Sequence, residues 1–133
     1  MIPQGTIRQG SRCSTSKAFL RPVRHRKNLH ISKKSHVLKI IIDPITKIAT
    51  GVQFEKGRKI YFVKASKEIV LSAGSIATPQ ILMLSGVGPA DHLTEKGIFP
   101  VIADLPVGKN LHDHVGIIGM VFLIGKKFSS KPL

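Results

Sequence analysis

The chain has 133 residues, the usual length of a single domain, and 42% of them are hydrophobic, which is enough to build a buried core. Its 21 Lys and Arg residues against 7 Asp and Glu residues give a formal net charge of +14. The single cysteine, Cys13, excludes an intrachain disulfide, and no spacing of Cys and His resembles a zinc site.

Residues 1–27 are polar and basic, and Pro and Gly interrupt them repeatedly. Residues 16–22 (SKAFLRP) are the one helical stretch we expect there, and Pro22 should end it. Ten basic residues and no acid precede Asp43, and a field of one sign attracts polyanions such as nucleic acid or an acidic membrane. Either the segment binds an anion, or it belongs to a longer protein whose other parts carry the balancing acids. The motifs below favour the second explanation.

Between residues 28 and 65, β-branched residues come in short runs separated by turn residues, which predicts strands joined by hairpins. Asp43 and Pro44 suit the start of one reversal, and Gly57 supplies the positive φ that a tight connection needs. Apolar residues such as Ile60 and Phe62 alternate with polar ones, so we expect one face of the strands to be covered and one to be solvated. The expected strands are residues 28–32, 36–43, 48–55 and 60–65.

A unit of strand, turn and helix is predicted from residue 68 to residue 84. Residues 68–72 (EIVLS) have the pattern of a buried strand, and three small residues follow it. Residues 78–84 have a helical pattern, with Pro79 in the first turn and Gly86 just past the end. In an open α/β sheet, such a turn brings the backbone close to a nucleotide bound at the carboxyl ends of the strands.

The remaining residues predict a short helix, two strands and a loop. The helix covers residues 89–96 and is closed by Gly97, and a strand follows at residues 98–102. Residues 104–114 (DLPVGKNLHDH) read as the loop. Residues 115–124 (VGIIGMVFLI) span about half of the ~20 apolar residues that a membrane-crossing helix needs, so we expect a buried strand and no transmembrane segment.

Four segments resemble the glucose-methanol-choline (GMC) oxidoreductases, in the order that this family uses. The most specific is residues 74–89 (GSIATPQILMLSGVGP), which is similar to the second signature of the family. Residues 10–22 (GSRCSTSKAFLRP) look like its G-x-R-x-S-T…A-F-L stretch, and residues 28–30 and 36–37 look like its adenine-side strands. Residues 104–114 look like its D-L-P-V-G-x-N-L-x-D-H loop.

This similarity runs from about Gly10 to about Gly116, roughly four fifths of the chain, and is closest to the insect-type glucose-dehydrogenase-like branch. It implies an α/β chain: part of an FAD/NAD(P)-binding (Rossmann-like) GMC fold with an antiparallel β-meander. It also implies that residues 1–27 are a basic irregular connecting segment, that residues 28–124 are part of the FAD-binding domain, and that residues 125–133 are a tail. The implied activity is FAD-dependent oxidation of the CH–OH group of a small alcohol or sugar, in which hydride moves to the flavin.

Three residues are candidates for contact with FAD. By resemblance, Val37 matches the position at which a strand of the family touches the adenine end of the cofactor; the alternative is an ordinary core valine. Gly74 and Ser75 have no bulky side chains, so the backbone at this turn can approach the cofactor closely. The alternative for these two residues is a tight turn that packing alone requires.

No residue of the chain is a catalytic candidate. The phosphate-binding pattern G-x-G-x-x-G is absent, and the chain ends before the region in which the family keeps its catalytic His. We therefore expect the isolated chain to bind FAD poorly and to turn over no substrate. We also expect marginal stability, because the predicted strand at residues 68–72 lacks its parallel neighbours.

Three other functions can be weighed against the sequence: metal binding, hydrolysis, and binding of nucleic acid or an anionic membrane. His112, Asp113 and His114 invite a metal site, but they lie in a predicted loop without further ligands, so a structural Asp–His hydrogen bond is the expectation. No G-x-S-x-G elbow supports hydrolase chemistry. A basic protein that binds nucleic acid or an anionic membrane is the alternative function, yet the basic stretch has no recognisable nucleic-acid module and only Phe19 as an aromatic, so no specific nucleic acid is expected as a partner.

Overall fold

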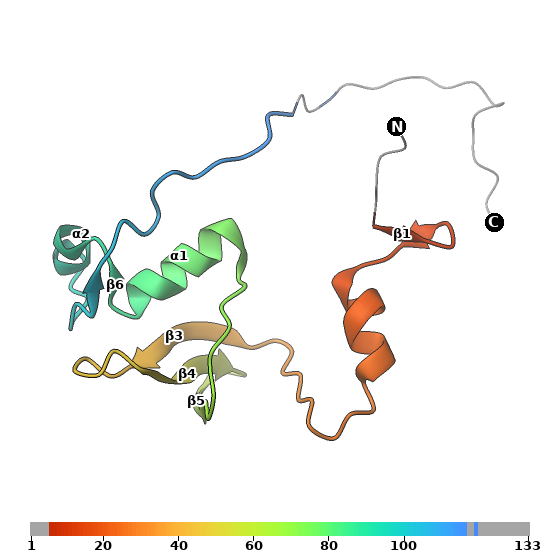
Figure 1. Ribbon diagram of the computed structural model, residues 1–133, viewed down its shortest axis with the longest axis horizontal. Coiled ribbons are helices and arrows are strands. Elements are labelled where there is room, and N and C mark those ends of the chain that lie inside the picture. The colour runs from red at the N-terminus through yellow and green to blue at the C-terminus, as the bar shows by residue number, and fades with distance from the viewer. Residues whose placement is uncertain (1–5, 117–118, 120–133) are drawn as a thin grey trace. The chain divides into compact units, whose positions relative to one another are not determined.

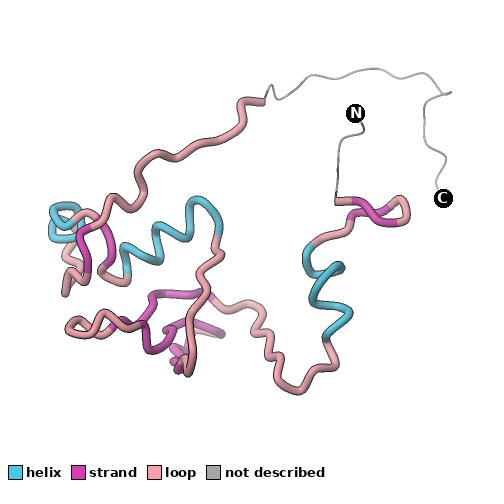
Figure 2. The backbone as a smooth tube through the Cα atoms, viewed as in Figure 1, coloured by secondary structure: helices cyan, strands magenta, loops and turns pink. Residues whose placement is uncertain are grey.

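The structure is a computed structural model that describes residues 6–116 and Gly119. These residues divide into two compact units, of which one contains residues 6–31 and the other is Ser32–His114 (Figures 1 and 2). The predicted strand at residues 115–124 and the tail at residues 125–133 therefore lie almost entirely outside the described residues. Among the helices that are described, none combines the length and the hydropathy that crossing a bilayer requires.

Residues 6–31 form a hairpin followed by a short helical segment. Strands β1 (Ile7–Arg8) and β2 (Ser11–Arg12) pair antiparallel. A π-helical turn, η1 (Ser16–Leu20), continues into a 3₁₀ turn, η2 (Arg21–Val23). The predicted helix is thus present, but it runs through Pro22 rather than ending there. Pro22 lies in the first turn of η2, where a backbone N–H would have no acceptor within the turn, so its absence costs no hydrogen bond.

The predicted antiparallel meander is present in the unit Ser32–His114. Strands β3 (His36–Ile42), β4 (Ala49–Lys56) and β5 (Lys59–Lys64) follow one another in the order β3-β4-β5 (Figure 1). The turn chemistry is also confirmed. Asp43 accepts hydrogen bonds at its Oδ1 from the N–H groups of the two residues after Pro44, at 3.0 and 2.7 Å. Gly57 has a φ of +57° in the tight β4–β5 connection.

Strand β5 does not have the one covered face that its alternating pattern predicted. All six of its residues are exposed, and Ile60 and Phe62 are 65% and 50% exposed. Helix α1 (Gly74–Leu84) packs against β3 at the other edge of the sheet, so β5 receives no cover from it (Figure 1). What β5 does gain is a cross-strand aromatic pair: Phe54 lies directly opposite Tyr61, and their rings stack with centroids 5.6 Å apart.

Helix α1 begins at Gly74, four residues earlier than the helix predicted from residue 78. The φ of Gly74 is +88°, which lets the chain turn directly into the helix, and the N–H of Ala73 donates to Oγ1 of Thr78 at 3.1 Å. Pro79 consequently lies inside the helix instead of in its first turn. It cannot donate to the carbonyl of Ser75, which loses that intrahelical hydrogen bond.

A small parallel pair follows α1. Strand β6 (Val87–Gly88) pairs with β7 (Ala103–Asp104), and helix α2 (Ala90–Glu95) connects them. The predicted helix at residues 89–96 is confirmed, and Gly97 closes it with a φ of +69°. The predicted strand at residues 98–102 is wrong, because strand pairing begins only at residue 103. Pro100, inside the predicted range, has no N–H with which to pair.

Two further predicted strands, residues 28–32 and 68–72, are not strands in the structure. Both have the composition of strands, but neither pairs with another segment within residues 6–116. Composition reports how side chains suit a pleated surface, whereas a strand also needs a neighbour for its backbone hydrogen bonds. Val70, in the centre of the second segment, is 77% exposed.

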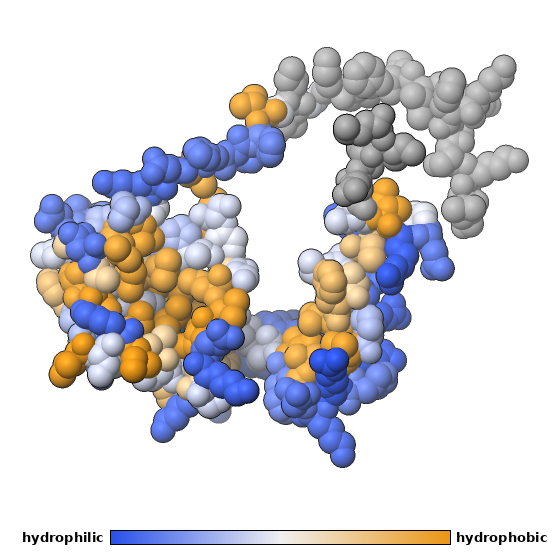
Figure 3. Space-filling model, viewed as in Figure 1, coloured by the Kyte–Doolittle hydropathy of each residue, from blue (hydrophilic) through white to orange (hydrophobic). Residues whose placement is uncertain are grey.

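The core lies along helix α1, which packs against strand β3 and against strand β6. Its buried apolar side chains are few, and they come from β3, α1, α2 and the approach to β7: Ile40, Ile81, Leu93 and Ile102. Many other large apolar side chains of this unit are exposed, and Figure 3 shows apolar side chains as orange atoms at its surface. A patchwork of exposed apolar residues is typical of a surface that meets another part of a protein.

Candidate functional site

A β-bulge positions Val37 at the start of the sheet. Val37 lies opposite Phe54 and Lys39 lies opposite Gln53, so Leu38 is an extra residue on this strand. Such bulges bend a strand and redirect its side chains, and they are common beside functional sites. Val37 and Leu38 are both half-buried, as expected where the alternation of the strand is broken.

The cavity beside Val37 lies between the start of β3 and one side of α1, from Ala73 to Leu84. It has a volume of about 230 Å³, and its lining includes Ala73, Ala77 and Gln80. The two alanines are small, and they leave room for a flat group between the helix and the strand. The amide of Gln80 is a polar side chain of this lining that can donate or accept a hydrogen bond.

Gly74 begins α1 and leaves open space where another residue would carry a Cβ atom. A Cβ built at this position meets no atom within 4 Å, and the positive φ of Gly74 disfavours any other residue there. The N-cap residue, Ala73, has no side chain with which to cap the helix, and the first turn carries no acid. No side chain of the N-cap residue therefore caps the first backbone N–H groups of α1, which carry the positive end of the helix dipole.

Ser75 lines a second cavity, with a volume of about 550 Å³. Pro79 and Met83 of α1 form one wall, and residues 108–112 form the other. The structure thus places Val37 and Ser75 in two different cavities that both border α1, while Gly74 lies at the start of the helix and lines neither. Of the three sequence candidates, only Gly74 and Ser75 are brought together, as chain neighbours.

The loop at residues 104–114 contributes more to the site than the sequence candidates suggested. It supplies the wall of the second cavity, and two of its residues, Gly108 and Asn110, have positive φ values of +86° and +58°. Asn is one of the few residues with a side chain that tolerates this conformation. The signal that could have identified this wall was the D-L-P-V-G-x-N-L pattern itself, which above indicates only the family resemblance.

Asp104, at the head of that loop, has a structural role. Its Oδ1 accepts a hydrogen bond from the N–H of Ala90 at 2.9 Å and so caps the first turn of α2. Asp113 accepts a hydrogen bond from the backbone N–H of His114 at 2.7 Å, so the expected Asp–His bond is made by the main chain rather than by the imidazole. In residues 6–116, no three His, Cys, Asp or Glu side chains gather in a way that could hold a metal ion.

Comparisons with known proteins place this chain. Its sequence matches the GMC oxidoreductase family over residues 2–116. It is 50% identical over 120 residues to glucose dehydrogenase [FAD, quinone] of Drosophila melanogaster. The aligned segment covers 86% of this chain and 19% of that protein.

Solved structures agree in fold. The chain is similar to an FAD-dependent oxidoreductase from Chaetomium thermophilum, with a TM-score of 0.66 and 43% identity over 71% of this chain and 16% of that one. It is also similar to pyridoxine 4-oxidase from Mesorbium loti, with a TM-score of 0.68 and 34% identity over 75% of this chain and 19% of that one. The chain spans about a fifth of the length of these proteins. By sequence and by α/β fold, the chain belongs to the GMC oxidoreductase family.

Proposed function

We propose that this chain forms part of the cofactor site of an FAD-dependent oxidoreductase that acts on CH–OH groups. FAD is named in two of the matched proteins, the glucose dehydrogenase and the Chaetomium enzyme. In the proposed enzyme, FAD supplies the acceptor for hydride from the alcohol carbon. In this proposal, the residues of this chain bind and orient the cofactor. None of them matches the catalytic His of the family.

The observation that carries the proposal is the start of α1. Gly74 combines a positive φ with open space around its missing Cβ atom, so the backbone there can be approached closely by a ligand. The uncapped N–H groups of the first turn and the absence of an acid there suit the phosphates of a dinucleotide. Ser75 adds a hydroxyl at the same turn, in the cavity whose other wall is the loop at residues 108–112.

Val37 is proposed to contact the adenine end of FAD from the opposite side of α1. Its cavity of about 230 Å³ is lined by apolar side chains of β3 and α1 together with three polar ones, Ser35, His36 and Gln80, which suits a flat, mostly apolar ring with polar edges. In this assignment, residues 28–124 are part of the FAD-binding domain, residues 1–27 connect to it, and residues 125–133 are a tail.

The substrate is assigned only by class, as a small molecule with an alcohol group. The matched proteins are named for glucose and for pyridoxine, which are chemically unlike. The residues that this chain contributes lie at the proposed cofactor site.

A chimera tests the proposal. Residues 2–116 replace the matching segment of the Drosophila melanogaster glucose dehydrogenase, and flavin content and glucose oxidation are measured. Gly74→Ala should lower the flavin content of this chimera. Gly57→Ala is the matched control, because Gly57 also has a positive φ and open space around a Cβ atom but lies in the β4–β5 connection. Equal loss of flavin in both variants, or in neither, would contradict the proposal.

A further inference from the structure

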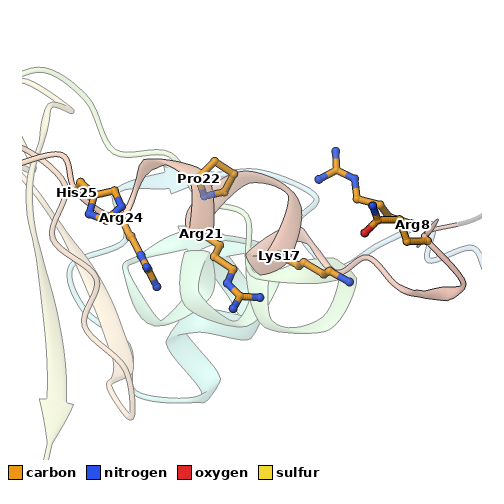
Figure 4. Close-up of a pocket in the computed structure, with 7 residues that line it drawn as sticks. Arg8, Lys17, Arg21, Pro22, Arg24 and His25 are labelled. Carbon is orange, nitrogen blue, oxygen red and sulfur yellow. The ribbon is translucent and has the colours of Figure 1, made fainter. Parts of the chain in front are cut away.

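A strongly basic hollow lies in the unit that contains residues 6–31, and it shares no lining residue with the two cavities of the proposed cofactor site. Its volume is about 390 Å³. Its lining has four permanent cations, one His and no acid: Arg8, Gln9, Lys17, Arg21, Pro22, Arg24 and His25 (Figure 4). The hairpin β1–β2 supplies the first two of these residues, and the segment that begins at η1 supplies the others.

The helical segment places three of these cations on one side. Lys17, Arg21 and Arg24 come from a π turn that continues into a 3₁₀ turn, and all three line the same hollow. Like charges that face one hollow repel one another. Within the described residues, the only salt bridge is between Lys96 and Glu95, so no carboxylate offsets the repulsion.

Hydrogen bonding and side-chain direction organise the hollow further. Lys17 is half-buried, and its Nζ donates to Oγ of Ser11 at 2.7 Å, which fixes the ammonium group beside the hairpin. Figure 4 shows the side chains of Arg21 and Arg24 extending in the same direction. The ammonium group of Lys17 and the guanidinium groups of Arg21 and Arg24 leave N–H donors from which an anion with several oxygens can accept hydrogen bonds.

We propose that this hollow binds the phosphate group of a small molecule. The guanidinium fork matches two phosphate oxygens at once, and an ammonium group serves as an additional point charge. A bound phosphate group would also remove the repulsion among the three helical cations. A volume of about 390 Å³ lies near the lower end of the range for small-molecule sites, which suits a compact ligand.

Two larger anionic partners, single-stranded nucleic acid and a membrane surface, fit the hollow less well. Proteins that hold single-stranded nucleic acid interleave their cations with aromatic rings on which bases stack, and His25 is the only ring of that kind in the lining. A membrane surface would require apolar side chains beside the cations. The exposed Ile7 and Phe19 are near in sequence but do not line the hollow.

Titration of the full 133-residue chain with inorganic phosphate at constant ionic strength tests the proposal, with backbone amide NMR shifts as the readout. We expect saturable shifts at Lys17, Arg21 and Arg24. The double variant Arg21→Gln/Arg24→Gln should weaken phosphate binding about tenfold or more. Arg21→Lys/Arg24→Lys keeps the charge but loses the forked donors, so it should weaken binding to an intermediate extent.

Lys59→Gln/Lys64→Gln is the control variant, because it removes the same charge from exposed positions on β5 and should change binding less than twofold, about the limit of a screened surface effect. Equal weakening by the control, or full binding by the Arg→Lys variant, would show a diffuse effect of net charge and overturn the proposal. Binding of a single-stranded oligonucleotide or of phosphatidylserine vesicles without any binding of phosphate would also overturn it. Native amide shifts of the β1–β2 hairpin, which belongs to the same unit as the hollow, establish in each variant that loss of binding is not loss of folding.

Discussion

The hydroxyl of Ser85 joins the end of helix α1 to strand β3 across 45 residues of sequence: its Oγ accepts a hydrogen bond from the N–H of Ile40 at 2.8 Å. The same hydroxyl donates to the carbonyl of Ile81 at 2.6 Å. Ser85, Ile40 and Ile81 are all buried, so one side chain satisfies two backbone groups in the small core. This bond fixes the helix against the edge of β3 that β4 leaves free, and it thereby sets the cavity between α1 and Val37.

Ser85→Ala should destabilise the chain by about 1–3 kcal/mol, because the buried N–H of Ile40 would lose its acceptor. The change is measured as the free energy of unfolding in urea, and the amide exchange rate of Ile40 should rise. Ser32→Ala is the control, since its hydroxyl bonds only exposed partners, and it should change stability by less than about 0.5 kcal/mol. An Ile40 amide as well protected in Ser85→Ala as in the unchanged chain would show that the hydrogen bond is not formed.

Gly86→Ala should be more destabilising than Gly97→Ala, although both glycines end helices with a positive φ, of +86° and +69°. A Cβ atom at Gly86 would lie 2.5 Å from the carbonyl oxygen of Pro100, whereas one at Gly97 meets nothing within 4 Å. Gly97→Ala should therefore show only the backbone penalty of about 1–2 kcal/mol. Gly86→Ala should exceed it and also disturb the β6–β7 pair, because the carbonyl of Gly86 accepts from the N–H of Ile102 at 2.7 Å. Equal unfolding midpoints for the two variants would contradict this ranking.

The sequence predicted the parts of the fold that depend on local chemistry. Strands β3, β4 and β5, the turn at Asp43, the connection at Gly57 and helix α2 were all expected from patterns within a few residues. The parts that it missed depend on partners far along the chain. The Ser85 to Ile40 bond and the parallel pairing of residues 87–88 with residues 103–104 have no signal in either segment alone.

The errors in the predicted strands have the same origin. Residues 68–72 have the side chains of a buried strand, but a strand requires a neighbour, and the described residues supply none. Ile60 and Phe62 alternate as they would above a covered face, yet α1 packs at the opposite edge of the sheet. For the site, the sequence put Gly74 and Ser75 in a turn before the helix, whereas both lie in the first turn of α1, and it did not reveal that Val37 and Ser75 line separate cavities.

The β3–β4 turn should open in acid. Hydrogen bonds from the N–H of Thr46, then from its hydroxyl, and from the N–H of Ile45 lower the pKa of Asp43 below its ordinary value of 3.8. Because the folded pKa is the lower one, the stabilisation is fully present above pH 3.8 and is lost as the pH falls through the folded pKa. Amide exchange at Ile45 and Thr46 should therefore rise in that window. Asp43→Asn keeps an acceptor oxygen without a titrating charge, so its exchange rates should not show this pH-dependent step.

Substitutions at Val37 separate contact with FAD from simple packing. If Val37 contacts FAD, Val37→Phe should lower flavin binding more than Val37→Ala; if it only packs in the core, the reverse should hold. The cavity of about 230 Å³ beside Val37 has room for a larger side chain, so Val37→Phe should be tolerated by the fold but should occupy the proposed place of the adenine ring. Val37→Ala leaves that place open and removes apolar surface worth about 1–2 kcal/mol of stability. In the glucose dehydrogenase chimera, Val37→Phe should therefore lower flavin affinity at least about tenfold, while Val37→Ala lowers the unfolding temperature but retains flavin. If Val37 is only a core residue, the alanine variant should be the worse of the two in both flavin content and stability, and the proposed contact would be rejected.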